Sequence, residues 1–240
     1  MAGRVARDFL TRRERDQKSL NEIGKKYVFA QLVTGNIFDE ENRLIAQVPP
    51  INEAPELHLR RHSSQNIDFT SFLLERVMVK FSEKYSVTDF SDLLRKSACF
   101  TESNQTLVEQ VLKSYWGGDY FAFTHSCIPF VESGIRRLLH LSGASVTKNK
   151  SNKEGGYDYR SLNDLLDSEQ TRAIFRHIFG EASGDVIYTL QITLTDNLGQ
   201  NLRNRVAHGI HQVDFFNRRH ADNLLKILFL LSIIQSKENS

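Results

Sequence analysis

The chain has 240 residues, of which 40% are apolar and 25% charged, so it is long enough for one large domain or two small ones with a hydrophobic core. Its formal net charge is only +2, from 31 basic and 29 acidic residues, which excludes a uniformly cationic surface for duplex nucleic acid. Cys99 and Cys127 match no metal or redox spacing, and we expect both to be reduced core thiols in a cytoplasmic protein.

Neither end of the sequence predicts export or membrane insertion. Residues 1–17, MAGRVARDFLTRRERDQ, are charged from the start and lack the apolar core of a signal peptide. The most apolar run, LLKILFLLSII at 224–234, has about half of the ~20 residues that a bilayer span needs, and Lys226 interrupts it. We therefore expect this run to be a buried helix and the protein to have no contact with a membrane.

The N-terminal region, residues 1–115, is predicted to be helical with one long interruption. Apolar residues among many charges predict a surface helix over 5–33. Segment 35–66 contains three prolines and many turn formers, which predicts a long connection with at most short helical pieces. Helical spacing returns at 68–86, and two shorter helices follow, near 87–97 and 103–115.

The second predicted domain, residues 116–240, begins with a helix that follows two glycines. Asp119 is a good N-cap for it, and Gly143 suits the left-handed residue after its end. Pro129 is expected to kink or divide the helix. Segment 145–161 is polar and contains glycines, which predicts a mobile loop with a lysine cluster that is either solvated or a lid or phosphate contact.

Further helices are expected near 161–167, 169–179 and 184–195, followed by the helix discussed next and a last helix at 217–236. The run VIYTLQITL is rich in strand formers, but capping residues on both sides also support a helix. No convincing pair of strands is present. The sequence therefore predicts an all-α chain: a C-terminal helical bundle preceded by an N-terminal helical region.

The stretch NLRNRVAHG, residues 201–209, brings an arginine, an asparagine and a histidine together on one short predicted helix. Asn204 and His208 are four apart and share a face, so the amide can orient the imidazole. Arg203 and His208 are five apart, which places them about 140° apart around a regular helix. Either the helix distorts near Gly209 so that the arginine swings round, or two copies of the helix combine. The second alternative predicts a homodimer.

An arginine and a histidine suit RNA cleavage without a metal. A guanidinium binds phosphate oxygens through two hydrogen bonds, and an imidazole exchanges protons near neutral pH. RNA supplies its own nucleophile, the 2′-hydroxyl. Gly209 indicates that His208 lies at the helix C-terminus, where the helix dipole favours the imidazolium form.

The string RNRVAHG, residues 203–209, resembles the signature of the HEPN superfamily (higher eukaryotes and prokaryotes nucleotide-binding). That signature is an arginine, a polar residue that is often asparagine, and a histidine four to six intervening residues after the arginine. The longer string LTDNLGQNLRNRVAHG, residues 194–209, is similar to a narrower family of uncharacterised domains with the hallmark RNxxxHG.

The upstream stretch 118–143 is similar to the same family, in which a helix carries a proline and a glutamate ahead of an arginine. In this sequence those residues are Pro129, Glu132 and Arg136. The likeness covers roughly residues 116–240. It implies a helical bundle that dimerises so that two motifs face each other across a cleft.

Many HEPN proteins are metal-independent endoribonucleases that leave a 2′,3′-cyclic phosphate and a 5′-hydroxyl. The resemblance therefore implies an RNA substrate and a homodimer for this chain, and family habit adds regulation by a partner protein and a role as a toxin or antiviral defence effector. Other members have lost activity and bind nucleotides or act as assembly modules.

The resemblance and the chemistry together suggest catalytic roles for three residues. His208 is the general acid or base, Arg203 stabilises the phosphorane-like transition state, and Asn204 is the orienting group. The alternative interpretation is structural: Arg203 pairs with a carboxylate such as Asp196, and His208 caps helix carbonyls.

Substrate contacts are expected from Arg205, Arg136 and His211. Arg205 points to another face and is either a salt bridge or a contact to the RNA backbone. Arg136 either forms an i,i+4 salt bridge with Glu132 or faces the cleft.

No metal or other cofactor is expected. His208, His211 and Asp214 recur at intervals of three, but zinc usually needs a third or fourth well-placed His or Cys. No phosphate-binding Gly-Lys-Ser/Thr string and no nucleophile elbow are present.

Two other function classes remain open. One is a non-catalytic helical interaction module, in which helix 224–234 forms a dimer or partner interface and Arg203 is structural. The other is a nucleotide-binding partner of a separate nucleotidyltransferase.

Overall fold

The computed structural model describes residues 8–38, 42–100, 105–149, 155–209 and 213–234. Its helices are α2 (Arg13–Lys26), α3 (Pro55–Lys84), α4 (Val87–Arg95), α5 (Gln105–Trp116), α6 (Tyr120–Leu141), α7 (Leu162–Leu166), α8 (Glu169–Phe179), α9 (Ser183–Leu194), α10 (Leu202–His208) and α11 (Arg218–Ser232). Short 3₁₀ helices are η1 (Val28–Gln31), η3 (Gly180–Ala182) and η4 (Val213–Phe215), and the strands are β1 (Gly35–Phe38), β2 (Leu44–Val48), β3 (Thr147–Asn149) and β4 (Tyr157–Tyr159). The fold is all-α, as the sequence predicts.

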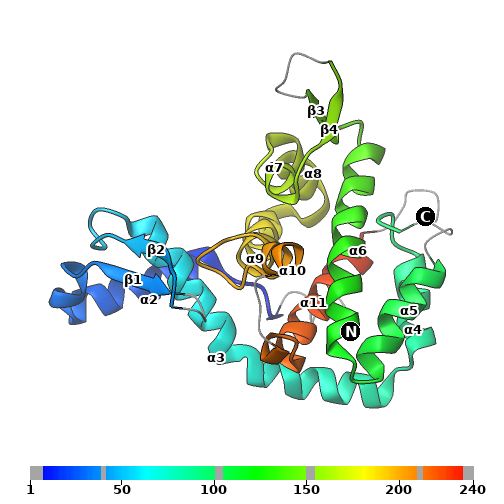
Figure 1. Cartoon of the computed structure of the whole chain (residues 1–240), viewed down its shortest axis with the longest axis horizontal. Helices are drawn as coiled ribbons and strands as arrows, with labels where there is room; N and C mark the ends of the chain where they lie inside the picture. Colours follow the sequence, from blue (N-terminus) through cyan, green and yellow to red (C-terminus); the bar gives the residue numbers. More distant parts are fainter. Residues whose placement is uncertain (1–7, 39–41, 101–104, 150–154, 210–212, 235–240) are drawn as a thin grey trace.

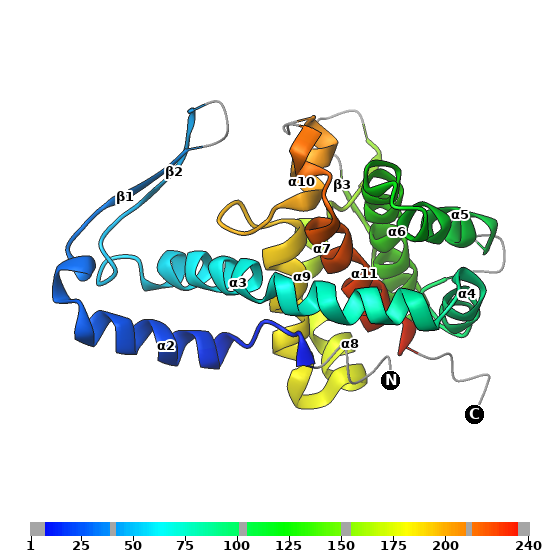
Figure 2. The same cartoon turned by 90° about the horizontal axis from the view of Figure 1, so that it is seen from below.

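The first helices form an arm that extends from a helical body (Figure 1). The arm contains α2, the first part of α3, and the hairpin of β1 and β2, and α2 runs alongside α3 (Figure 2). The surface helix predicted over 5–33 is shorter than expected. Among the described residues it covers only Arg13–Lys26 before the chain turns through η1.

The connection predicted over 35–66 is wrong in two respects. Strands β1 and β2 pair antiparallel, with Gly35 opposite Val48. In addition, α3 starts at Pro55 and is 30 residues long. Proline is favoured at the first position of a helix, where its missing N–H would have no partner, so this proline begins a helix rather than interrupting one.

A second hairpin lies within the predicted loop 145–161, where β3 pairs antiparallel with β4. One member of the lysine cluster is engaged, because Lys148 Nζ donates to Asp164 Oδ2 at 2.7 Å. Lys150 and Lys153 lie outside the described residues. The expectation that no strands pair is therefore wrong at both hairpins, although both are too short to change the fold class.

Helix α6 is continuous through Pro129, so the predicted division does not occur. A proline removes one helical hydrogen bond, but its neighbours Cys127, Ile128, Phe130 and Val131 are buried, and their packing holds the helix together. The predicted ends are confirmed. The side chain of Asp119 accepts from Ala122 N–H at 2.9 Å, and Gly143 is left-handed with φ 74°.

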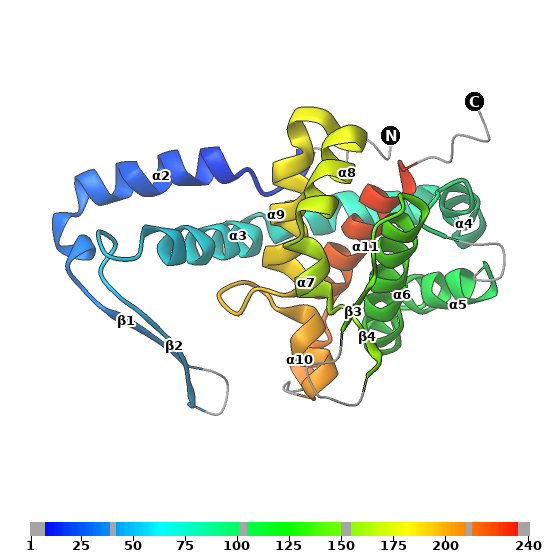
Figure 3. The same cartoon turned by 90° about the horizontal axis from the view of Figure 1, so that it is seen from above.

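Helix α11 is the centre of the core and packs against α3, α4, α6 and α9 (Figure 3). Every residue from Ala221 to Ser232 is buried, which confirms the buried helix predicted at the end of the chain. The apolar face of α11 is buried against other helices of the same chain. It is therefore not exposed as the dimer or partner interface that the interaction-module alternative requires. No helix in the described ranges is long and apolar enough to cross a bilayer.

The core extends across both halves of the chain, with Met78 and Phe90 in the same cluster as Phe123 and Leu228. Cys99 and Cys127 are free thiols inside it, as expected. Burial raises the pKa of the Cys99 thiol to about 12, which leaves it protonated and unreactive at neutral pH.

Candidate functional site

Helix α10 carries the RNxxxHG motif at one end of the body, on the side toward which the β1–β2 hairpin also projects (Figure 2, Figure 3). Left-handed residues bound it: Asn201 with φ 52° before its start and Gly209 with φ 65° after its end. Leu202 is fully buried and anchors the first turn in the core. His208 is the last helical residue, as the sequence predicts.

The loop between α9 and α10 sets the position of the motif. Gln200 N–H donates to the carbonyl of Ile192 at 2.8 Å, so the loop folds back on α9. Gly199 lies so close that a Cβ atom there would be 2.1 Å from the same carbonyl oxygen. A side chain at residue 199 is therefore incompatible with this path of the loop.

Arg203 is held by an acid from a distant helix. Its Nε donates to Glu132 Oε2 of α6 at 3.2 Å, and its Nη1 donates to Asn204 Oδ1 at 3.1 Å. The side chain remains 27% exposed. The structural interpretation, in which Arg203 pairs with a carboxylate, is therefore met by Glu132. Its example Asp196 is not the partner, because that carboxylate pairs with Arg60 Nη1 at 3.3 Å.

Glu132 binds two guanidinium groups. Its second oxygen, Oε1, accepts from Arg136 Nη2, which confirms the i,i+4 salt bridge predicted for this pair. The Arg136 guanidinium also lies 5.5 Å from the centre of the Tyr159 ring. Its Nη1 is buried without a hydrogen-bond partner among the described residues. Two cations on one carboxylate leave a local excess of positive charge with unused donor capacity.

Asn204 orients Arg203 and not His208. Its Oδ1 accepts from Arg203, while its Nδ2 donates to the carbonyl of Thr195 at 3.2 Å and to Asn201 Oδ1 at 2.8 Å. The expectation that this amide holds the imidazole is therefore not met. Asn204 instead links the arginine to the α9–α10 loop.

His208 is exposed at the C-terminal end of α10. Its imidazole makes no hydrogen bond or ion pair with another residue that the structure describes, and its exposure makes it accessible to a substrate. The helix stays regular up to this residue. Arg203 reaches toward α6 rather than around the helix, and the two side chains of one chain do not converge.

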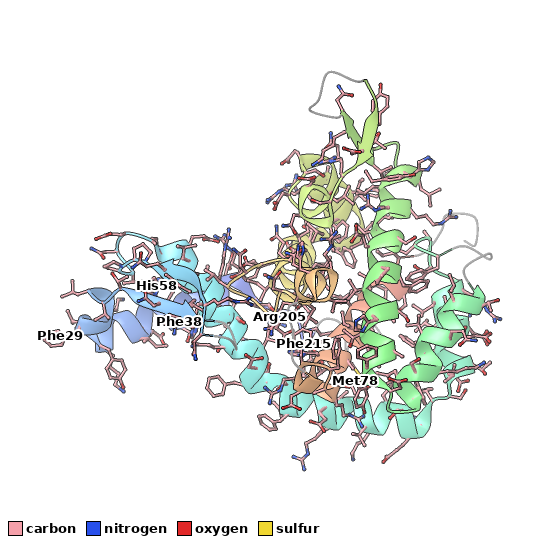
Figure 4. The ribbon with its side chains drawn as sticks, viewed as in Figure 1. Phe29, Phe38, His58, Met78, Arg205 and Phe215 are labelled. Atoms are coloured by element: carbon pink, nitrogen blue, oxygen red, sulfur yellow. The ribbon has the colours of Figure 1, made fainter. Side chains whose placement is uncertain are left out.

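Arg205 stacks on an aromatic ring. Its guanidinium carbon lies 4.4 Å from the centre of the Phe215 ring in η4, and the two side chains are adjacent in Figure 4. Phe215 is buried, so this contact ties α10 to the segment that precedes α11. His211, the remaining predicted substrate contact, lies outside the described residues.

The described residues contain no group of three or more His, Cys, Asp or Glu side chains that could hold a metal ion. The possible metal ligands His208, His211 and Asp214 include His211, which lies outside the described residues.

Several contacts that build the site could not be found from the sequence. The bond between Glu132 and Arg203 joins residues 71 positions apart, and no local pattern indicates it. The contacts of Tyr159 and Phe215 with arginines depend in the same way on tertiary packing. The two partners of the Asn204 amide nitrogen, Thr195 and Asn201, do lie within the quoted string 194–209.

No protein-family model matches the chain, and no curated protein or solved structure is detectably similar to it.

Proposed function

We propose that this chain is a metal-independent endoribonuclease of the HEPN type whose active site combines two copies of α10 in a homodimer. The supporting observation is that α10 holds its arginine in a fixed position and leaves its histidine exposed. Arg203, in the first turn of α10, is fixed by Glu132 and Asn204. His208, the last residue of the same helix, is exposed.

In this mechanism the arginines bind the scissile phosphate. Arg203 is preoriented by its two partners, so little reorganisation is needed when charge develops on the non-bridging oxygens. Arg136 shares the same glutamate and adds a second cation beside it. The carboxylate of Glu132 sets where these guanidinium groups lie and does not itself react.

His208 moves the protons. The neutral imidazole of one copy removes the proton of the 2′-hydroxyl as that oxygen attacks the adjacent phosphorus. The P–O5′ bond breaks, and the imidazolium formed in this way donates the proton to the leaving 5′-oxygen. The products are a 2′,3′-cyclic phosphate and a 5′-hydroxyl, and no metal or external nucleophile is needed.

The geometry of α10 favours the two-copy alternative. A regular helix places residues five apart about 140° from each other. In this chain the helix is regular to its last residue, and Arg203 is already bound on the α6 side. A guanidinium and an imidazole meet at one phosphate only if the second comes from another copy.

The direct test is cleavage of single-stranded RNA in excess EDTA by wild type and by His208→Ala. We expect the substitution to abolish cleavage without changing the circular dichroism spectrum. His177→Ala, which changes an exposed histidine of α8, is the matched control and retains activity. A 2′-deoxy nucleotide at the cut site also blocks the reaction. Cleavage undiminished by either change would reject the mechanism.

A further inference from the structure

A small pocket lies beneath the N-terminal segment, away from α10. Its volume is about 220 Å³, and its walls come from residues 8–16, from the middle of α3 and from α11. None of the residues assigned to RNA cleavage lines it. The polar members of its lining include Thr11, Asp16, Ser63, Asn223 and Lys226.

Lys226 is a buried cation in this pocket. It is only 2% exposed, although it lies in the middle of the apolar helix α11. Its Nζ donates to Asn223 Oδ1 at 3.0 Å, and it forms no ion pair with any described residue. An ammonium has three N–H donors, so two remain without a partner in the part of the chain that the structure describes.

The carboxylate in the pocket is satisfied by other groups. Asp16 accepts from Ser63 Oγ at 2.7 Å and from Asn66 Nδ2 at 3.0 Å. Arg15 Nε lies 3.7 Å from Asp16 Oδ1. Asp16 therefore does not serve as the direct counterion of Lys226. A second unused group lines the same pocket, because the Thr11 hydroxyl is buried without a hydrogen-bond partner among the described residues.

We propose that this pocket binds a small oxyanion, a carboxylate or a phosphate, between the Lys226 ammonium and the Thr11 hydroxyl. Water in the pocket would fill hydrogen bonds but leave the buried charge uncompensated, and an uncompensated buried charge is costly. An oxyanion supplies both a negative charge and several acceptors for these donors. A volume of about 220 Å³ is enough for a small ligand of this kind.

Burial lowers the pKa of Lys226 to about 8, so the ammonium still predominates at pH 7. Anion binding is therefore expected to weaken above pH 8, as the neutral amine forms. The other charged side chains that face the pocket are Asp8, Arg15 and Asp16.

The experiment is calorimetric titration of the full chain with sodium acetate and, separately, with inorganic phosphate, at an ionic strength held constant with sodium chloride. We expect saturable binding of one or both anions, one per chain. Lys226→Met, which keeps an unbranched side chain one atom shorter and removes the charge, is expected to weaken binding at least about tenfold, since a charge-assisted hydrogen bond contributes roughly 1.5–3 kcal/mol. Lys113→Met changes an exposed lysine of α5 and is the matched control.

Thr11→Val provides a second, milder variant, for which we expect about three- to tenfold weaker binding. The absence of saturable binding in wild type, or equal affinity in wild type and Lys226→Met, would overturn the proposal. Binding of acetate alone or of phosphate alone supports it and identifies the anion. Because no cleavage residue lines the pocket, anion binding and RNA cleavage succeed or fail independently.

Discussion

Glu132 and Arg203 are joined by a 3.2 Å contact across 71 residues of chain, from the middle of α6 to the first turn of α10. The glutamate side chain is 15% exposed, so the contact is largely shielded from solvent. It connects α6 to the helix that carries the RNxxxHG motif. The motif arginine is thus positioned by the bundle and not by α10 alone.

Glu132→Gln is expected to reduce kcat for RNA cleavage by about 10- to 100-fold, because a guanidinium released from its anchor no longer holds the phosphate in line. KM should change less, since Arg203 and Arg136 keep their charge. Initial rates over a range of RNA concentrations separate the two constants. Glu109→Gln, which breaks the ion pair of Glu109 with Arg95 elsewhere on the surface, should leave both unchanged.

Two inactive variants are expected to complement each other. Mixing Arg203→Ala with His208→Ala under subunit exchange produces mixed dimers, half of the total, each with one intact site of two. About a quarter of wild-type activity should therefore return. Activity measured before and after exchange tests this outcome. If both residues acted within one chain, the mixture would stay inactive.

Gly199→Ala is expected to destabilise the protein by about 1–3 kcal/mol and to lower cleavage activity, because the added methyl collides with the Ile192 carbonyl and displaces the α9–α10 loop. Urea unfolding measures the change. Gly184→Ala is the control: its Cβ would meet nothing within 4 Å and its φ is ordinary, so stability should stay equal or rise by about 0.4–1 kcal/mol. Equal effects of the two substitutions would contradict this account of the loop.

Asp222 is expected to make the protein less stable as the pH rises through the weakly acidic range. Burial raises the pKa of Asp222 to about 6 from 3.8, while Tyr115 donates a hydrogen bond to it. The folded state therefore binds more protons than the unfolded state between about pH 4 and 6, and stability falls across that window by up to about 3 kcal/mol.

The measurement is the difference in the free energy of unfolding between wild type and Asp222→Asn at a series of pH values. We expect the difference to change between pH 4 and 6 and to be constant above it. A difference that is flat throughout would show that Asp222 titrates at its ordinary pKa. The comparison cancels the other carboxylates, which both proteins share.

Local signals in the sequence were enough to predict most helices of the body. Ser86 and Asp89 form a capping box at the start of α4, and Ser161 and Asp164 form another at α7, so both helices begin where the sequence predicts. The sequence does not predict the hairpins, because their strands are very short and are defined by pairing with a partner strand. Nothing in a run of three to five residues indicates that partner.

The site shows the same division between local and tertiary information. The end of α10 at Gly209 follows from its neighbours, since a left-handed glycine commonly ends a helix. Helical spacing predicts His208 as the partner of Asn204, whereas the fold brings the Thr195 carbonyl and the Arg203 side chain within hydrogen-bonding distance. Spacing identifies which groups can meet, and tertiary packing selects among them.

The arm carries solvent-exposed apolar side chains. Phe29 is 84% exposed, and the cross-strand pair of Phe38 and Leu44 is more than half exposed. Phe29 and Phe38 lie on the arm, well away from the body (Figure 4). A two-stranded ribbon also leaves both edges open to pairing with another chain. We therefore expect the arm to promote self-association at high protein concentration. We expect that replacing Phe29 with serine would let the protein be concentrated further before it aggregates.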